Sequence, residues 1–202
     1  MKILQVNKKN LIIAVNALHQ AGVVVFPTET VYGMAGDPFN AEVIDKIYKI
    51  KGRGFNKPLS LIADSFKTVE KYFKLNLVER RMAKKFWPGA LTIILKLKKQ
   101  TNNALGKLNR VGSDIAVRVS SSGLAQQLAT NSRGLIISTS ANISGLPECS
   151  DPGAVIKQFK NRKYQPNLIL DAGRLKKQKP STIILVKGDK INIVRQGEVY
   201  IK

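Results

Sequence analysis

Histidine and cysteine are nearly absent from this 202-residue sequence, which contains one of each, His19 and Cys149. A single cysteine excludes an internal disulfide framework. A single histidine excludes the zinc motifs that need two of them. His19 lies near the end of a predicted helix and is interpreted as a surface or capping residue. A histidine-based catalytic triad is therefore not expected.

Long apolar runs are absent too. No segment reaches the roughly 18–20 apolar residues that a membrane-spanning helix requires. Residues 1–10 show neither the apolar core nor the cleavage site of a signal peptide. With 44% hydrophobic and 23% charged residues, the composition is that of a globular chain. We therefore expect a cytoplasmic protein whose residues 1–202 form a single domain.

Acidic residues are scarce, with 13 against 34 lysines and arginines, so the formal net charge is +21. This excess indicates anionic partners, namely RNA, nucleotides or both. A lysine-rich surface without such a partner is the alternative. Basic residues gather in 96–110 and 174–179, where aromatic residues hardly interleave with them. Contact with phosphates is therefore favoured over stacking on bases.

Two predicted strands end in small polar residues. Residues 23–26 are apolar, Pro27 ends their regular pairing, and a loop with two threonines and two glycines follows. Residues 135–138 form a second apolar strand, which runs into the hydroxyl-rich segment 139–145. In open α/β sheets ligands bind at strand ends, although an ordinary turn would also explain the first segment. We therefore expect a ligand pocket at these strand ends.

Cations follow a predicted helix close to this loop. Asn40 is expected to cap the helix and Gly52 to end it, and Lys51, Arg53 and Lys57 fall within seven residues. These charges suit a phosphate clamp, although they would also complement the dipole at the end of the helix. The GxxxxGK[ST] pattern is absent, so this is not a Walker A loop.

Arg118 interrupts the apolar strand predicted for residues 115–119. A charge in a buried strand is costly unless a partner of opposite charge lies beside it. An anionic ligand would supply that partner, and so would an internal salt bridge. The sequence leaves both alternatives open.

Hydrophobic periodicity predicts the remaining elements. Helices are expected at 8–20, 65–73, 77–87, 124–130 and 151–160, with Asp64, Asn76 and Asp151 as N-caps. Strands are expected at 58–63, 91–97 and 168–170, and a hairpin is expected from 181–186 with 191–194. The hairpin argues against an all-parallel sheet. We therefore predict a single α/β domain with a twisted mixed sheet and helices on its faces.

Six short motifs spread over nearly the whole chain resemble those of the YrdC/TsaC family of threonylcarbamoyl-AMP synthases, in its short bacterial form. They are PTETVYG at 27–33, Lys51-x-Arg53, WPGALT at 87–92, Ser140-x-Asn142, Pro180-Ser181-Thr182 and VRQG at 194–197. Gly54 stands where relatives commonly have proline, which leaves both charges of the Lys-x-Arg motif in place. The resemblance implies a YrdC-like fold with a basic cavity on one side of the sheet.

The resemblance also implies a reaction, in which L-threonine, bicarbonate or CO₂, and ATP give L-threonylcarbamoyladenylate and pyrophosphate. The product serves threonylcarbamoyladenosine modification of tRNA, so tRNA or the transfer complex would be the downstream partner. ATP with Mg²⁺ would contact Lys51, Arg53, Lys57, Ser140, Asn142 and Arg195, of which Lys51 and Arg53 would act in catalysis. Threonine would contact Thr30, Arg118, Ser138 and Ser181. The sequence identifies no metal ligand.

Two other functions explain part of the sequence. A non-catalytic binder of double-stranded RNA or tRNA would account for the charge, but it would not need hydroxyl-rich loops at two strand ends. The carbamoyl-transfer domain of hydrogenase maturation shares the expected fold, but it usually lies within a longer chain that has zinc-finger cysteines. The sequence therefore favours the synthase.

Overall fold

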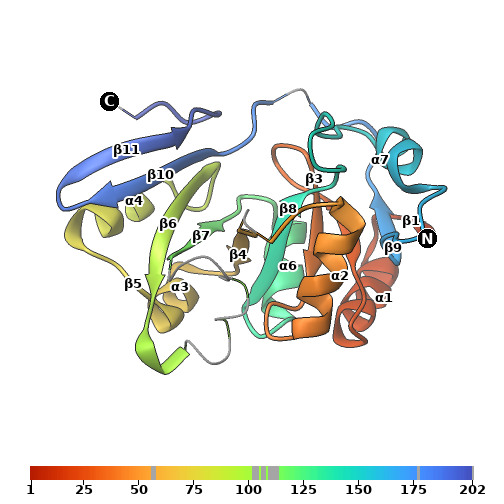
Figure 1. Ribbon diagram of the computed structural model, residues 1–202, viewed down its shortest axis with the longest axis horizontal. Helices are drawn as coiled ribbons and strands as arrows, with labels where there is room; N and C mark the ends of the chain where they lie inside the picture. The colour runs from red at the N-terminus through yellow and green to blue at the C-terminus, as the bar shows by residue number, and fades with distance from the viewer. Residues whose placement is uncertain (56–57, 102–104, 106–107, 109–113, 177, 202) are drawn as a thin grey trace.

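A computed structural model describes residues 1–55, 58–101, 105, 108, 114–176 and 178–201 (Figure 1). Its centre is one mixed sheet in the strand order β1-β9-β2-β3-β8-β4-β7-β6-β10-β11, with the short β5 added to β6. The strands are Lys2–Gln5 (β1), Val24–Pro27 (β2), Tyr32–Gly36 (β3), Leu61–Ala63 (β4), Phe73–Lys74 (β5), Leu91–Leu97 (β6), Asp114–Val119 (β7), Leu135–Ser140 (β8), Leu168–Asp171 (β9), Thr182–Lys187 (β10) and Lys190–Arg195 (β11). Parallel pairs are β1–β9, β9–β2, β4–β7 and β6–β10, and the other pairs are antiparallel. The predicted α/β fold with a mixed sheet is confirmed.

Helices lie on both faces of this sheet. They are Lys8–His19 (α1), Ala41–Lys51 (α2), Phe66–Tyr72 (α3), Leu77–Phe86 (α4), Gly123–Thr130 (α6) and Pro152–Phe159 (α7), with a 3₁₀ turn at Lys99–Thr101. In Figure 1, α1, α2 and α7 gather at one end of the sheet and α3 and α4 at the other. Within the described residues, no helix has the length and apolar character needed to span a bilayer.

Polar side chains begin these helices, mostly as predicted. Asn40, Asn76 and Asp151 each accept a hydrogen bond from a backbone N–H of the first helical turn. The prediction of Asp64 as the cap of α3 is wrong. Ser65 is the cap, because its Oγ accepts from the Thr68 backbone N–H at 3.2 Å. The Asp64 carboxylate instead accepts from the hydroxyls of Ser65 and Thr68.

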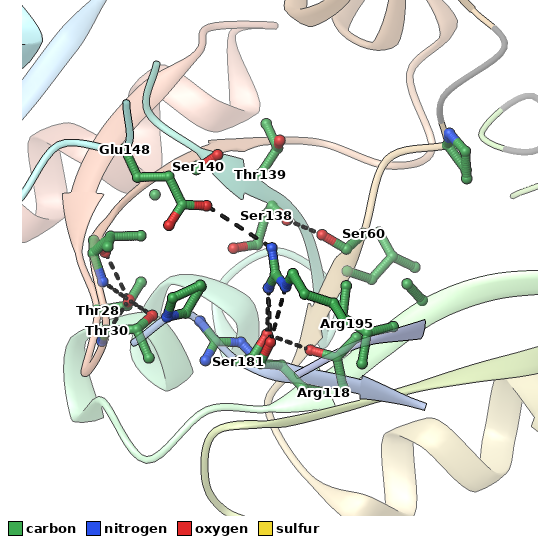
Figure 2. Close-up of a pocket in the computed structure, with 18 of the residues that line it drawn as sticks. Thr28, Thr30, Ser60, Arg118, Ser138, Thr139, Ser140, Glu148, Ser181 and Arg195 are labelled. Atoms are coloured by element: carbon green, nitrogen blue, oxygen red, sulfur yellow. Dashed lines mark hydrogen bonds and ion pairs between the residues drawn. The ribbon is translucent and has the colours of Figure 1, made fainter. Parts of the chain in front are cut away.

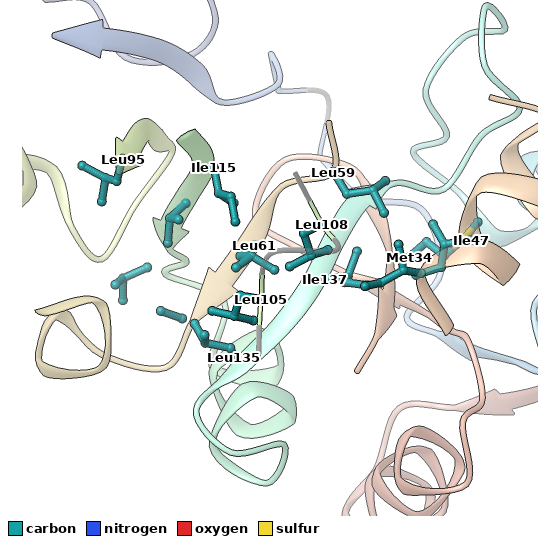
Figure 3. Close-up of a cluster of buried hydrophobic side chains, with 14 of the residues drawn as sticks. Met34, Ile47, Leu59, Leu61, Leu95, Leu105, Leu108, Ile115, Leu135 and Ile137 are labelled. Carbon is teal, nitrogen blue, oxygen red and sulfur yellow. The ribbon is translucent and has the colours of Figure 1, made fainter. Parts of the chain in front are cut away.

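The hydrophobic core has two parts, one on each face of the sheet. Alternate residues of a strand point to opposite faces. The larger cluster packs α2, α3, α4 and α7 against one face, and Figure 3 shows part of it, from Met34 and Ile47 across to Leu95 and Ile115. The smaller cluster packs α1 and α6 against the other face, over β9, β2, β3, β8 and β4. That face continues onto β7, β6 and β10, where no described helix covers it.

The strand β3 was not predicted, because the segment after Pro27 was expected to be a loop. Glycine is depleted in strands, and two glycines lie in this one. Here they allow close packing. A Cβ on Gly36 would lie 2.5 Å from Cγ1 of Val43 in α2, and one on Gly33 would lie 3.1 Å from the Phe26 ring. The segment therefore forms a hairpin with β2 and also pairs with β8.

Candidate functional site

A cavity of about 380 Å³ occupies the uncovered part of the sheet (Figure 2). Its floor is formed by side chains of β6, β7 and β10 that point away from the larger core. Its walls come from the loop between β2 and β3, the end of β8 and the segment before β10. The polar residues that line it are Thr28, Thr30, Arg53, Ser60, Thr92, Arg118, Ser138, Thr139, Ser140, Glu148, Ser181 and Arg195. Three arginines therefore face a single carboxylate among the described lining residues.

Arg118 rises from the floor of the cavity, opposite Ile62 in the register of β7 with β4. Its guanidinium forms an ion pair with Glu29, and both side chains are largely buried. Burial lowers the pKa of Arg118, whereas the Glu29 carboxylate raises it. The internal salt bridge considered from the sequence is therefore present. Because Arg118 also lines the cavity, the ion pair and a ligand contact are compatible.

Arg195, at the end of β11, lies next to the segment before β10. Its Nε and Nη2 donate to the Ser181 carbonyl at 3.1 and 2.8 Å, and Nη2 also donates to the Ser181 hydroxyl at 3.1 Å. That hydroxyl lies 2.8 Å from the Thr92 hydroxyl. Burial lowers the pKa of Arg195. The Glu148 carboxylate, 3.9 Å from the Arg195 Nη1, acts in the opposite direction. These contacts fix both residues at the cavity wall (Figure 2).

Arg53 reaches the cavity from the loop after α2. Its Nη2 donates to the Pro58 carbonyl at 3.0 Å. Its Nε is buried and has no hydrogen-bond partner among the described residues. A buried N–H without an acceptor is costly, so the Nε of Arg53 is an exception among the buried polar atoms that the structure describes.

Lys51 lies behind the cavity wall and does not line the cavity. Its ammonium group is buried and donates to the Ser140 carbonyl at 2.6 Å, the Asn142 carbonyl at 3.0 Å and the Asn142 Oδ1 at 3.1 Å. Burial, with a smaller effect of Arg53, lowers the pKa of Lys51 to about 8. The Ser140 hydroxyl donates to the same Asn142 Oδ1 at 2.7 Å. In this structure Lys51 therefore holds the loop that carries Ser140 at the cavity.

The loop between β2 and β3 brings two threonine hydroxyls to the cavity. The Thr28 Oγ1 donates to the Val31 carbonyl at 2.7 Å and accepts from the Thr30 backbone N–H at 3.1 Å. The two hydroxyls lie 3.1 Å apart. Thr28 therefore folds the loop, and Thr30 lies beside it at the wall.

Most of the residues predicted from the sequence come together in this one cavity, namely Thr30, Arg53, Arg118, Ser138, Ser140, Ser181 and Arg195. Lys51 and Asn142 lie behind its wall, and Lys57 lies outside the described residues. The sequence interpretation assigned no role to Glu29, Ser60, Thr92 or Glu148. Glu29 and Thr92 belong to recognised motifs, which is the one signal that could have drawn attention to them. Glu148 lies in the segment 145–149, which also resembles the short bacterial form of the family, whereas Ser60 carries no such signal.

Comparison with known proteins supports the motif resemblance. The sequence pattern of the Sua5/YciO/YrdC family, described as "Telomere recombination", matches residues 16–197. A protein of Methanocaldococcus jannaschii is 34% identical over 180 residues, which are 89% of this chain and 82% of that protein. The threonylcarbamoyl-AMP synthase of Photobacterium profundum is 35% identical over 154 residues, 74% of this chain and 81% of that enzyme.

Solved structures give the same assignment. P. abyssi Sua5 complexed with L-threonine superposes with a TM-score of 0.85 and 28% identity over 97% of this chain, which spans only 56% of Sua5. E. coli YciO superposes with a TM-score of 0.82 and 26% identity, covering 97% of this chain and 93% of YciO. The resemblance inferred from the motifs is confirmed, and the chain belongs to the Sua5/YciO/YrdC family.

Proposed function

We propose that this protein is a threonylcarbamoyl-AMP synthase, which condenses L-threonine, bicarbonate or CO₂, and ATP into L-threonylcarbamoyladenylate and pyrophosphate. The observation that carries the proposal is the cavity itself, with Arg118 at its floor and with Arg53, Arg195 and several hydroxyls around it. A relative with 35% identity is named for this activity, and a structural neighbour was solved with L-threonine. Both support the assignment.

In the proposed reaction the free amine of threonine first combines with CO₂, a C–N bond forms, and the nitrogen loses a proton to solvent to leave a carbamate anion. A carbamate oxygen then attacks the α-phosphorus of ATP, the bond from that phosphorus to the β-phosphate bridging oxygen breaks, and pyrophosphate leaves. The carbamate is already a nucleophilic anion, so the step needs no strong side-chain base. It needs positioning, neutralisation of phosphate charge and exclusion of water. The cavity residues are of these types.

The proposed roles follow from position. Arg118 would bind the threonine carboxylate through the two-pronged geometry that suits a guanidinium, with Thr30, Ser138 and Ser181 beside it. Arg53 and Arg195 would neutralise phosphates, because both guanidinium groups belong to the cavity lining. Ser140 would donate to ATP at the wall. Lys51 and Asn142 would act through the loop that presents Ser140, and Lys57 is retained as a phosphate contact from the sequence alone.

Magnesium would accompany ATP. The described residues form no cluster of three or more acidic, histidine or cysteine side chains that could cage a metal ion. This fits Mg²⁺ bound chiefly by phosphates and water with at most one or two protein carboxylates, and Glu148 is the described carboxylate that lines the cavity. The ion would share the negative charge of the triphosphate as pyrophosphate leaves.

The proposed product would pass to the machinery that modifies tRNA, so the protein would work in the cytoplasm with tRNA or the transfer complex as its partner. Pyrophosphate release from ATP tests the proposal, with threonine and bicarbonate omitted in turn. We expect release to require both and an AMP-linked product to form. Turnover that is indifferent to threonine would contradict the assignment, and ATP-independent RNA binding alone would support the non-catalytic alternative.

A further inference from the structure

Glu29 lies between Thr28 and Thr30 in the loop that joins β2 to β3. Its two carboxylate oxygens have separate partners. Oε1 accepts from the Nη1 of Arg118, and Oε2 accepts from the hydroxyl of Ser120. One acidic side chain therefore joins the hairpin of β2 and β3 to the end of β7. Glu29 and Arg118 are 89 residues apart in the sequence.

The two partners of Glu29 are two residues apart, with Arg118 within β7 and Ser120 directly after its last residue. Ser120 is completely buried. Its hydroxyl also accepts from the backbone N–H of Ser122 at 3.2 Å, at the N-cap of α6. The carboxylate is thus held at two points, and Arg118 is paired with a carboxylate that has its own second anchor.

Arg118 is a long side chain whose ordering costs conformational entropy when it binds a ligand. The ion pair orders it beforehand, in a place where 9% of its side chain and 17% of that of Glu29 are exposed. The described contact with Glu29 uses Nη1, and a guanidinium has five N–H donors, so donors remain for a second carboxylate.

We propose that Glu29 is a positioning residue, which holds the guanidinium of Arg118 in the orientation that receives the carboxylate of the amino-acid substrate. The inference rests on the proposed function, because it assumes that the amino acid binds at Arg118. Glu29 does not line the cavity among the described residues, so it acts on the substrate through Arg118.

The test compares Michaelis constants for the two substrates in Glu29→Gln, which keeps the size of the side chain and removes its charge. We expect the KM for threonine to rise about tenfold, as for the loss of one charge-assisted hydrogen bond, while the KM for ATP stays within about twofold. A rise of both constants together would mean a general structural role and would overturn the proposal.

A double-mutant cycle with Arg118→Lys supplies the second measurement. If Glu29 acts through Arg118, adding Glu29→Gln to Arg118→Lys should raise the KM for threonine by less than about threefold. A further rise of about tenfold in that background would show that the two residues act independently, which would also overturn the proposal.

Asp37→Asn is the matched control. Asp37 pairs with Arg133 at 2.6 Å and is 23% exposed, so it is a similar ion-paired carboxylate, but it lies outside the cavity lining. It should leave both Michaelis constants unchanged.

If Glu29→Gln does not fold, Ser120→Ala removes one anchor of the carboxylate and should raise the KM for threonine about threefold. An unchanged value there would overturn the proposal. Wild-type turnover that ignores threonine would instead refute the proposed function.

Discussion

Buried cations in this molecule are stabilised in two different ways. Arg118 has a carboxylate, Glu29, as its partner. Lys51 has three uncharged oxygens of the Ser140–Asn142 loop, and hydrogen bonds to neutral acceptors compensate a buried charge less than a carboxylate does. Burial is the largest influence on the pKa of both side chains, and it lowers that of Lys51 to about 8, whereas the Glu29 carboxylate partly offsets its effect on Arg118.

The low pKa of Lys51 predicts a pH-dependent stability. In the unfolded chain the lysine has its ordinary pKa of 10.5, so between pH 8 and 10.5 the unfolded state binds more protons than the folded state. The wild type should therefore gain stability relative to Lys51→Met as the pH rises in this window. The quantity compared is the difference between their free energies of unfolding. The slope should approach about 1.4 kcal/mol per pH unit at its steepest.

Urea unfolding of both proteins across pH 7 to 10.5 measures this difference. Lys51→Met is an unbranched side chain one atom shorter than lysine and has no ionisable group, so it serves as the reference at every pH. A difference that stays constant, or that falls as the pH rises, would contradict a buried ammonium group at this position.

At the scale of elements, the hairpin of β2 and β3 fixes the position of α2. Gly36 at the end of β3 lies against Val43 and Ile47 of that helix, and α2 ends in Lys51, which supports the cavity wall. Helix α2 therefore packs on Gly36 near its beginning and carries Lys51, which supports the cavity wall, at its end. The local sequence pattern does not predict the contact of Gly36 with Val43 and Ile47, because these residues belong to two different elements.

Gly36→Ala should destabilise the fold. The new Cβ would lie 2.5 Å from Cγ1 of Val43 and 2.8 Å from Cδ1 of Ile47, so the helix would have to move. Overpacking of this kind costs about 1–3 kcal/mol, which corresponds to roughly 2–4 °C in Tm for each kcal/mol in a chain of this size. Thermal unfolding followed by circular dichroism measures the change.

Gly123→Ala is the control for the Gly36 variant. A Cβ there would meet no atom within 4 Å, and Gly123 is the first residue of α6. Alanine has the higher helix propensity, so this variant should be as stable as the wild type or slightly more stable. Equal Tm values for Gly36→Ala and the wild type would show that β3 and α2 are not packed as described.

At the scale of the whole molecule, the charge of +21 is spread well beyond the cavity. Helix α4 alone exposes Arg81, Lys84 and Lys85 on its outer surface. These cations lie on the far side of the sheet from the cavity, because α4 packs in the larger core. RNA binding and ATP turnover should therefore depend on different residues.

Two variants separate these properties. Arg53→Ala removes a cavity donor, so turnover should fall by roughly 10²–10³ while RNA binding changes little.

The triple variant Arg81→Gln, Lys84→Gln, Lys85→Gln should keep its turnover. If α4 binds RNA, the slope of log affinity against log salt should become shallower by about 0.9 for each phosphate that the helix no longer neutralises. The measurements are pyrophosphate release and RNA binding at several salt concentrations. Near-normal turnover in Arg53→Ala, together with abolished RNA binding, would show that Arg53 binds RNA instead.

The sequence by itself determined the features that depend on neighbours along the chain. Asn40, Asn76 and Asp151 begin helices because a side-chain oxygen can reach the N–H groups two or three residues ahead. The apolar strands and the terminal hairpin follow from periodicity and turn residues. The family resemblance also implied that Arg53, Arg118, Ser140, Ser181 and Arg195 contact the substrates, and the structure brings these residues to the same cavity.

Only the tertiary structure decided which residues meet across the sheet. The segment Tyr32–Gly36 becomes a strand because Phe26 and α2 pack against its glycines, which overrides their low strand propensity. Lys51 turns behind the cavity wall because the Ser140–Asn142 loop offers three oxygens there. Glu29 and Arg118 are 89 residues apart, and their pairing depends on where the hairpin loop lies over β7. Contacts of this kind come from packing in three dimensions, and no pattern of neighbouring residues encodes them.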